Sequence, residues 1–215
     1  MAIICPTVTA TNEKEYAEQL HKVVPLSSRL HLDFTDGKFA PTQSPPLDKA
    51  WWPAGINVDL HIMYKQPQEY LKTIFKLMPR LVIVHAEAEG SFYNLAEQLK
   101  AHGIKVGLAL LKQTAVTQIE SVLADLDHVL IFSGDLGHFG GTVNLGLLDK
   151  VRDIKNANPK IEIGWDGGIN DRNAASLIKG GVDVLNVGGY IHNAANPVHA
   201  YATLKEIAQK SKQMP

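Results

Sequence analysis

The sequence has one cysteine, no excess charge of either sign and no long apolar run. With Cys5 alone among 215 residues, no internal disulfide can form, so nothing indicates an oxidising compartment. The 21 Lys and Arg residues balance 22 Asp and Glu residues, which removes a general attraction for nucleic acid or anionic lipid. No apolar stretch approaches the ~20 residues that cross a bilayer, and the run at residues 2–5 is too short for a signal peptide. We therefore expect a cytoplasmic protein without nucleic-acid or membrane partners.

The chain also has no linker rich in proline or serine and no low-complexity tract. Its hydrophobic fraction of 45% is ordinary for a globular protein and is interspersed with charge, which excludes a disordered tail. A chain of this length fills one core well and two cores poorly. Residues 1–215 are therefore expected to form a single domain.

Eight short runs rich in Val, Ile and Leu recur along the chain, as expected of strands that are buried on both faces. They begin at Ile3, Arg29, Asn57, Leu81, Lys105, His128, Lys160 and Val182. Between them lie amphipathic stretches of helical period, for example at residues 15–23, 70–75 and 92–101. Asn12 and Ser91 stand where helix N-caps are expected, and Gly103 stands where a helix should end.

This alternation predicts parallel strands joined by right-handed helical crossovers. Either a closed (β/α)₈ barrel or an open doubly wound sheet would satisfy it. Eight near-equal repeats without a second domain favour the barrel, an α/β fold of the TIM type. In that fold the carboxyl ends of the strands form the mouth where functional residues gather.

Titratable side chains recur at these predicted strand ends. They are His31 and Asp33, His61, His85 and Glu87, and Asp166. Taken singly, each His is typical of a hydrogen-bonded structural residue, and each Asp is typical of a loop cap. His31 and Asp33 are two residues apart, so both face the same side of their strand. Two His and two Asp converging at one barrel mouth indicate a divalent-metal site, and this donor set suits Zn²⁺, Fe²⁺ or Mn²⁺.

Pairs of glycines follow three consecutive strands. They are Gly140–Gly141, Gly167–Gly168 and Gly188–Gly189. One such pair would be ordinary turn chemistry, but glycine also exposes backbone N–H groups and lets a ligand approach closely. Barrels of this type bind phosphate at the loops after strands 7 and 8. The three pairs therefore predict a phosphorylated small molecule as the partner.

The motifs resemble one known family. The segments CPTV, HLDFTDGKFAP, DLHIM, VHAEA, HFGG, WDGGIN and the strand end Val187-Gly188-Gly189 are similar to those of ribulose-phosphate 3-epimerases, in the same order. The likeness runs from about residue 4 to about residue 199. It implies a (β/α)₈ barrel of the ribulose-phosphate-binding type. It also implies an isomerase that uses a divalent metal to interconvert D-ribulose 5-phosphate and D-xylulose 5-phosphate.

The resemblance also assigns roles to residues. It implies His31, Asp33, His61 and Asp166 as metal ligands, with Asp33 and Asp166 as the acid/base pair. It implies that Gly167, Gly168, Gly188 and Gly189 hold phosphate, and we expect further substrate contacts from Thr7, Thr9, Met63, His85, Gly140 and Gly141. The chemistry agrees, because inverting a carbon beside a carbonyl requires proton removal on one face and proton return on the other. A metal would stabilise the enediolate between the two steps.

The chain departs from the family pattern around the substrate. The family serine near the N-terminal proline is missing from Thr7-Val8-Thr9-Ala10, where Thr9 offers a hydroxyl and Ala10 does not. Thr35 and Phe132 replace family methionines, whereas Met63 remains. The loop at residues 135–142 reads DLGHFGGT, with His138 as an apparent insertion. His138 could contact the substrate phosphate or lie in solvent, and we favour solvent.

These departures leave alternative functions open. An altered substrate wall would suit epimerisation of another ketose phosphate, such as a hexulose 6-phosphate. A non-catalytic sugar-phosphate-binding protein is a second alternative, although the candidate ligand set is complete. A lyase or decarboxylase would more naturally place a lysine at the mouth, and none ends the relevant strands. We also expect a homo-oligomer, for which residues 51–53 (Trp-Trp-Pro) offer either an interface patch or packing at the barrel rim.

Overall fold

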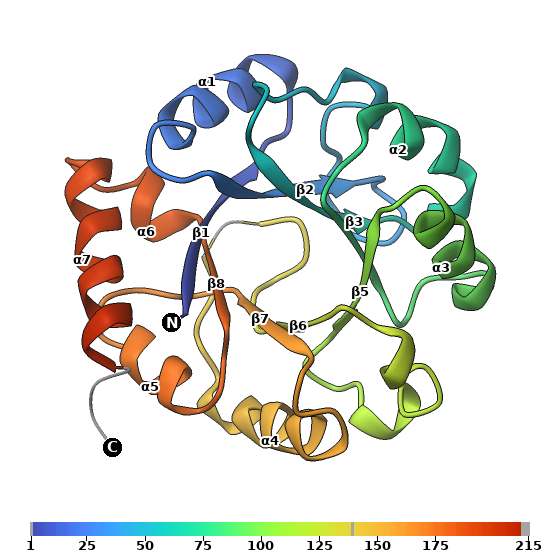
Figure 1. Ribbon diagram of the computed structural model, residues 1–215. Coiled ribbons are helices and arrows are strands. Elements are labelled where there is room, and N and C mark those ends of the chain that lie inside the picture. Colours follow the sequence, from blue (N-terminus) through green and yellow to red (C-terminus); the bar gives the residue numbers. More distant parts are fainter. Residues whose placement is uncertain (1, 139, 212–215) are drawn as a thin grey trace.

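Eight parallel strands form a closed barrel in the computed structural model, which describes residues 2–138 and 140–211 (Figure 1). The strands are β1 (Ile3–Thr9), β2 (Arg29–Thr35), β3 (Asn57–Met63), β4 (Leu81–His85), β5 (Lys105–Leu110), β6 (His128–Phe132), β7 (Glu162–Asp166) and β8 (Val184–Val187). Each strand pairs with the next along the chain, and β8 closes on β1. The predicted (β/α)₈ barrel is therefore confirmed. The last two strands begin two residues later than the apolar runs indicated.

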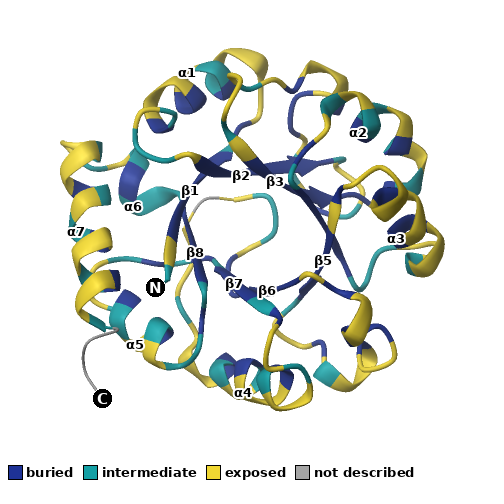
Figure 2. Cartoon of the chain, in the orientation of Figure 1, coloured by how far each residue is buried: buried dark blue, intermediate teal, exposed yellow. Residues whose placement is uncertain are grey.

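Helices surround the barrel and bury one face each against it (Figure 2). The α-helices are α1 (Glu13–Val23), α2 (Leu71–Leu77), α3 (Phe92–Ala101), α4 (Leu148–Ala157), α5 (Ala174–Lys179), α6 (Gly189–His192) and α7 (Pro197–Ser211). Asn12 and Ser91 cap α1 and α3 through their side chains, as predicted. Gly103, at φ 73°, follows the end of α3.

The crossover between β5 and β6, like the one between β2 and β3, differs from the expected alternation because it contains no α-helix. Two short 3₁₀ segments, Val116–Gln118 and Leu123–Asp125, take its place. The intervening sequence is rich in β-branched Thr and Val, which lose side-chain freedom in a helix. Ile119, Val122 and Leu123 still cover the barrel from this segment, so the core is closed without a regular helix.

The period of two along each strand sorts side chains between two compartments. Leu30, Leu32 and Phe34 of β2 point outward into the layer between barrel and helices and are fully buried there. His31 and Asp33 alternate with them and therefore point into the barrel interior. The alternation along β2 thus places its polar side chains inside the barrel and its apolar side chains in the layer between barrel and helices.

The amino-terminal end of the barrel, which we call the floor, is filled by an ionic network. Nε of Arg29 lies 2.6 Å from Asp59, and its two terminal nitrogens lie 2.9 and 2.7 Å from the oxygens of Glu162. Arg80 contacts Asp59 at 2.7 Å, and Nδ1 of His128 contacts Glu162 at 2.9 Å. Burial would raise the pKa of Glu162, but the hydrogen bonds from His128 and Arg29 hold it well below its usual range. The carboxylates of the floor are therefore compensated by neighbouring cations.

Candidate active site

Four predicted residues meet at the opposite end of the barrel, which we call the mouth. They are His31 and Asp33 of β2, His61 of β3 and Asp166 of β7. Each offers one nitrogen or oxygen, and these atoms all lie within 4.8 Å of one another. Nδ1 of His61 lies 2.9 Å from Asp33 and 4.0 Å from Asp166. Nε2 of His31 lies 3.1 Å from Asp33 and 3.9 Å from Asp166. The residues predicted from four separate positions therefore form one cluster.

The hydrogen bonding of this cluster is incomplete. His31 is fully buried, yet its Nδ1 has no hydrogen-bond partner among the described residues, and its Nε2 has only the contact of 3.1 Å with Asp33. A buried imidazole with unused donor and acceptor capacity is costly unless a ligand completes it. Two imidazole nitrogens and two carboxylate oxygens converging within bonding reach of one point suit a divalent cation. The residues present therefore fit a metal ion.

The charges of the cluster lead to the same conclusion. Burial, together with the negative charge of Asp33, raises the pKa of Asp166. Burial acts in the same direction on Asp33, but the positive charge of His31 and the hydrogen bond with His61 outweigh it and hold that pKa well below its usual range. Without a cation, one of the two carboxyl groups keeps a proton. A divalent ion would offset the negative charge that the two carboxyl groups bring together.

A line of polar residues supports His61 from behind. Its Nε2 lies 3.0 Å from Nε2 of His85, and Nδ1 of His85 lies 3.3 Å from Glu87. Glu87 in turn accepts hydrogen bonds from the backbone N–H of Leu111 and the hydroxyl of Thr114. If Nδ1 of His61 binds a metal, its proton lies on Nε2 and points to His85, whose own proton then faces Glu87. This arrangement fixes the tautomer of a metal-ligating histidine.

His85 was expected at the mouth as a substrate contact; it ends β4 at the mouth but lies behind His61. It is 2% exposed and does not line the cavity described below. The ring of Phe39, from the loop after β2, lies 4.8 Å from the ring of His85 and covers it. His85 therefore contacts His61 rather than the space open to substrate.

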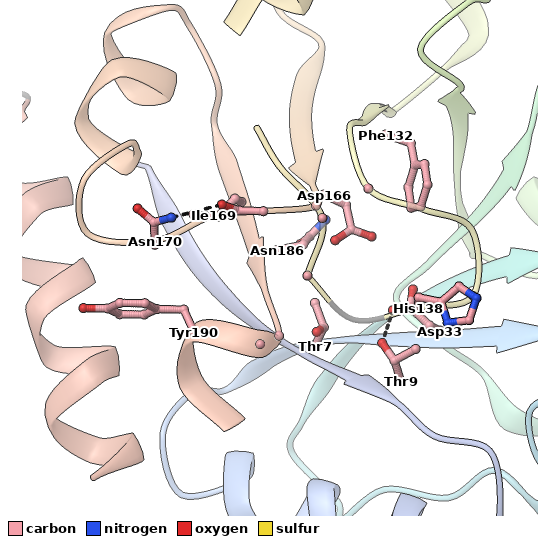
Figure 3. A pocket seen from close by; sticks show the side chains of 18 of the residues that line it. Thr7, Thr9, Asp33, Phe132, His138, Asp166, Ile169, Asn170, Asn186 and Tyr190 are labelled. Carbon is pink, nitrogen blue, oxygen red and sulfur yellow. Dashed lines mark hydrogen bonds between the residues drawn. The ribbon is translucent and has the colours of Figure 1, made fainter. Parts of the chain in front are cut away.

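A cavity of about 290 Å³ opens above the cluster (Figure 3). Of the predicted residues, it is lined by Thr7, Thr9, Asp33, Met63, Gly140, Gly141, Asp166, Gly167, Gly168, Gly188 and Gly189. The hydroxyl of Thr9 donates a hydrogen bond of 2.5 Å to Asp33, as Figure 3 shows. Thr9 thus supplies a hydroxyl group to the candidate acid/base residue, whereas Thr35 is buried away from the cavity.

Glycine loops form one side of the cavity. Gly167 and Gly168 have φ angles of 104° and 74°, where a side chain would be strained. A Cβ atom on Gly167 would lie 2.1 Å from the backbone nitrogen of Gly134, and one on Gly168 would lie 2.6 Å from that of Val143. The loops after β6 and β7 therefore pack backbone against backbone. Neither lysine nor arginine is among the described residues that line this cavity, so an anion there would be held by uncharged donors.

Several cavity residues were not predicted from the sequence. They are Asn170 after β7, Asn186 of β8, Tyr190 of α6 and Asn193 at the end of α6, and all of them line it. Their signal in the sequence is weak because asparagine is common in turns. Asn186 alone lies inside an apolar strand, where a polar residue stands out.

His138 also lines the cavity, although it is an exposed residue. An exposed position at the edge of the cavity is compatible with both interpretations of His138, so its role stays a prediction. The hydroxyl of Thr42 donates a hydrogen bond to the carbonyl of Gly137 and holds this part of the loop over the mouth. Phe139, within the HFGG motif, lies outside the described residues.

The closed barrel, the His and Asp cluster and the glycine-lined cavity define an enzyme of the (β/α)₈-barrel class. The model of the ribulose-phosphate 3-epimerase family matches residues 3–192. The chain therefore belongs to this family and is an isomerase.

Individual relatives agree with the family match. The chain is 28% identical over 214 residues to ribulose-phosphate 3-epimerase of Helicobacter pylori strain J99, covering 96% of this chain and 98% of that protein. It is 30% identical over 216 residues to the chloroplastic ribulose-5-phosphate-3-epimerase of Arabidopsis thaliana, covering 94% and 76%. Among the described residues, no helix is long and apolar enough to span a membrane.

Solved structures share the fold at lower identity. The 3-keto-L-gulonate-6-phosphate decarboxylase of Vibrio cholerae superposes with a TM-score of 0.73 at 13% identity, covering 100% of this chain and 99% of that chain. At this identity the likeness shows the barrel fold and does not transfer a reaction.

Proposed function

We propose that the protein epimerises D-ribulose 5-phosphate to D-xylulose 5-phosphate at C3 with the help of a divalent metal ion. The observation that carries the proposal is the placement of Asp33 and Asp166. Asp33 is buried and Asp166 is partly buried; they come from β2 and β7, on separate parts of the barrel wall, and share one cluster beneath the cavity. Two carboxyl groups that reach one substrate carbon from different sides are what inversion next to a carbonyl requires.

The two carboxyl groups differ in proton affinity, which suits opposite roles. The pKa of Asp166 is raised by burial and by the charge of Asp33, so Asp166 holds a proton more readily. The pKa of Asp33 is held low despite burial by His31 and His61, so Asp33 is ionised. In one direction of the reaction, the ionised group removes the C3 proton and the protonated group returns one to the other face. The roles exchange in the reverse direction, because one turnover leaves the first group protonated and the second group ionised.

His31, Asp33, His61 and Asp166 would hold the metal ion, which supplies Lewis-acid stabilisation of the negative charge that develops on the substrate oxygens. The donor set suits Zn²⁺ and also Fe²⁺ or Mn²⁺. His85 and Glu87 would keep His61 in the tautomer that binds metal.

Backbone N–H groups of the glycine loops would bind the substrate phosphate. The loops that follow β6, β7 and β8 all line the same side of the cavity, and a Cβ atom on Gly189 would lie 3.9 Å from the backbone of Gly140. Uncharged backbone donors arranged in this way can bind phosphate without a lysine or arginine. The phosphate would therefore fix one end of the substrate while C3 lies between Asp33 and Asp166.

The lone buried thiol of Cys5 is consistent with work in the reducing cytoplasm, which we propose as the location. That residues 1–215 form one domain and that the protein is a homo-oligomer remain predictions.

Proton exchange at C3 tests the proposed function. Protein of known metal content is incubated with D-ribulose 5-phosphate in D₂O, and deuteration at C3 and formation of D-xylulose 5-phosphate are followed by NMR. We expect both in the wild type, and no D-xylulose 5-phosphate in Asp33→Asn or Asp166→Asn. Asp48→Asn, at an exposed position, is the matched control and should react like the wild type. Exchange with a hexulose 6-phosphate alone would redirect the proposal to that sugar, and no exchange with any ketose phosphate would overturn it.

A further inference from the structure

Asn186 of β8 presents a carboxamide that the protein itself leaves unused. The residue is 2% exposed, yet neither its Oδ1 nor its Nδ2 has a hydrogen-bond partner among the described residues. Buried amides are nearly always hydrogen-bonded, because an unpaired amide loses its hydration without compensation. A leucine would fill a similar volume at this position without that cost. The asparagine therefore calls for a partner outside the chain.

The strand directs this carboxamide into the cavity. Leu185 and Val187, on either side of Asn186, belong to the apolar layer between barrel and helices. Asn186 therefore points to the barrel interior, where it lines the same cavity as Asp166, as the labelled side chains of Figure 3 show. Asn186 is also paired with Asp166 across the β7–β8 register. It thus lies beside one candidate acid/base residue.

Two residues farther along, β8 leads into the glycines of the predicted phosphate site. Gly188 and Gly189 line the cavity after Val187 ends the strand. Asn186 is therefore located between the carboxyl group of Asp166 and the glycine loops. In the proposed binding mode, C3 of the substrate lies at Asp166 and the phosphate lies at the glycine loops. The part of a ketose 5-phosphate that spans this interval is C4, which carries a hydroxyl group.

We propose that Asn186 is a specificity-determining residue that hydrogen-bonds the C4 hydroxyl group of the substrate. This assignment rests on the proposed function, because that function orients the sugar in the cavity. A hydroxyl group both donates and accepts, and a carboxamide offers an acceptor in Oδ1 and donors in Nδ2. The pair would satisfy the amide and select ligands that carry a hydroxyl between the reacting carbon and the phosphate.

A binding experiment with unreactive ligands tests this assignment without relying on turnover. Ribitol 5-phosphate lacks the carbonyl group, and its 4-deoxy analogue also lacks the C4 hydroxyl. Calorimetry measures both with the zinc-loaded wild type, with Asn186→Leu and with Val184→Ala. Val184 is the interior-facing neighbour two residues earlier on β8 and is the matched control. The melting temperature of each metal-free variant is measured alongside.

In the wild type, removing the C4 hydroxyl should weaken binding about 10- to 100-fold, because the amide is left unpaired again. In Asn186→Leu the two ligands should bind equally, and the metal-free variant should melt at or above the wild-type temperature. Val184→Ala should lower the melting temperature and keep the discrimination.

Two results would contradict the proposal in distinguishable ways. Discrimination that persists in Asn186→Leu, or a fall in its melting temperature with loss of binding of both ligands, would show a structural role for Asn186. If the wild type exchanges C3 protons normally but binds both polyol phosphates equally, only the Asn186 assignment fails. If it neither exchanges C3 protons nor binds either ligand, the proposed function fails as well.

Discussion

The two ends of the barrel bury similar groups in opposite ways. At the floor, Asp59 and Glu162 lie against Arg29, Arg80 and His128, and each carboxylate has cationic partners in the chain. At the mouth, Asp33 and Asp166 share a pocket with two histidines, and no lysine or arginine is among the described residues of the cluster or the cavity. The carboxylates of the floor are neutralised by arginines of the chain, whereas those of the mouth have only histidines beside them.

The floor and the mouth are therefore expected to serve different purposes, the floor stability and the mouth function. A carboxylate network neutralised by arginines contributes to the folded state without a ligand. A pair of carboxyl groups with only histidines beside it instead raises the proton affinity of one member and leaves the hydrogen bonding of His31 incomplete. An arrangement that is unfavourable in the free protein is typical of a site where a bound ligand relieves it. Substitutions at the floor should therefore change stability, and substitutions at the mouth should change metal binding and activity.

The largest expected effect is at the mouth. Asp166→Asn should lower kcat for C3 epimerisation by about 10²- to 10⁴-fold, because one face of the substrate loses its proton donor. Stability of the metal-free protein should change little, since the raised pKa of Asp166 shows that its charged form is disfavoured there, and Asn resembles the neutral form in shape. Steady-state kinetics and thermal unfolding measure the two quantities. A loss of activity that merely followed a loss of folded protein would contradict this separation.

At the floor, Arg29→Met should have the largest effect on stability. The change leaves Asp59 and Glu162 short of a buried cation, and such losses cost about 3–5 kcal/mol of unfolding free energy. The guanidinium of Arg29 is 8% exposed, so water cannot replace it well. Urea unfolding measures the difference. Lys14→Met, at an exposed position, is the control and should shift the free energy of unfolding by less than about 0.5 kcal/mol. A change that small in Arg29→Met would show that the floor network contributes little.

A smaller effect is expected for the residues behind His61. Glu87→Gln should weaken metal affinity by about 10- to 100-fold, because His85 loses the carboxylate that orients its proton. Competition with a chelator measures the affinity, and ¹⁵N NMR of the imidazoles reports the tautomers. Glu89→Gln, at an exposed position in the same loop, should bind metal like the wild type. Equal metal affinity in Glu87→Gln and Glu89→Gln would show that metal binding by His61 does not depend on the Glu87 carboxylate.

The smallest effect concerns acid stability. The pKa of Glu162 is lower in the folded protein, so the unfolded chain binds a proton there first as pH falls. Its stabilisation is therefore complete above about pH 4.3, the ordinary value, and is lost progressively below it. Glu162→Gln should cost about 1–2 kcal/mol at neutral pH and progressively less toward pH 3. Urea unfolding across that range measures this. Parallel stability curves for the two proteins would contradict it.

The sequence predicted the barrel well because strands buried on both faces are continuous apolar runs. It was less accurate for the crossover between β5 and β6 and for the first residues of β7 and β8. The segment between β5 and β6 has the apolar residues of a helix but too many β-branched residues to form one. The first residues of the runs at Lys160 and Val182 precede β7 and β8 instead of belonging to them.

The same distinction holds for the candidate site. His31, Asp33, His61 and Asp166 could be grouped from the sequence, because strand ends of one barrel meet at one rim. The burial of His85 could not be predicted, since it depends on the ring of Phe39 from a distant loop. Asn186 was missed because facing inward or outward in a four-residue strand is decided by the register of the closed barrel.

The central claim, that the mouth is built for a cation and the floor is not, is tested most directly by titrating metal-stripped protein with Zn²⁺ in a calorimeter. The account predicts one ion per chain, a higher melting temperature with zinc, and loss of both in His31→Ala. His128→Ala, which removes a buried histidine of the floor, should bind zinc like the wild type while lowering stability. Zinc binding that is absent in the wild type, or that survives unchanged in His31→Ala, would contradict the account.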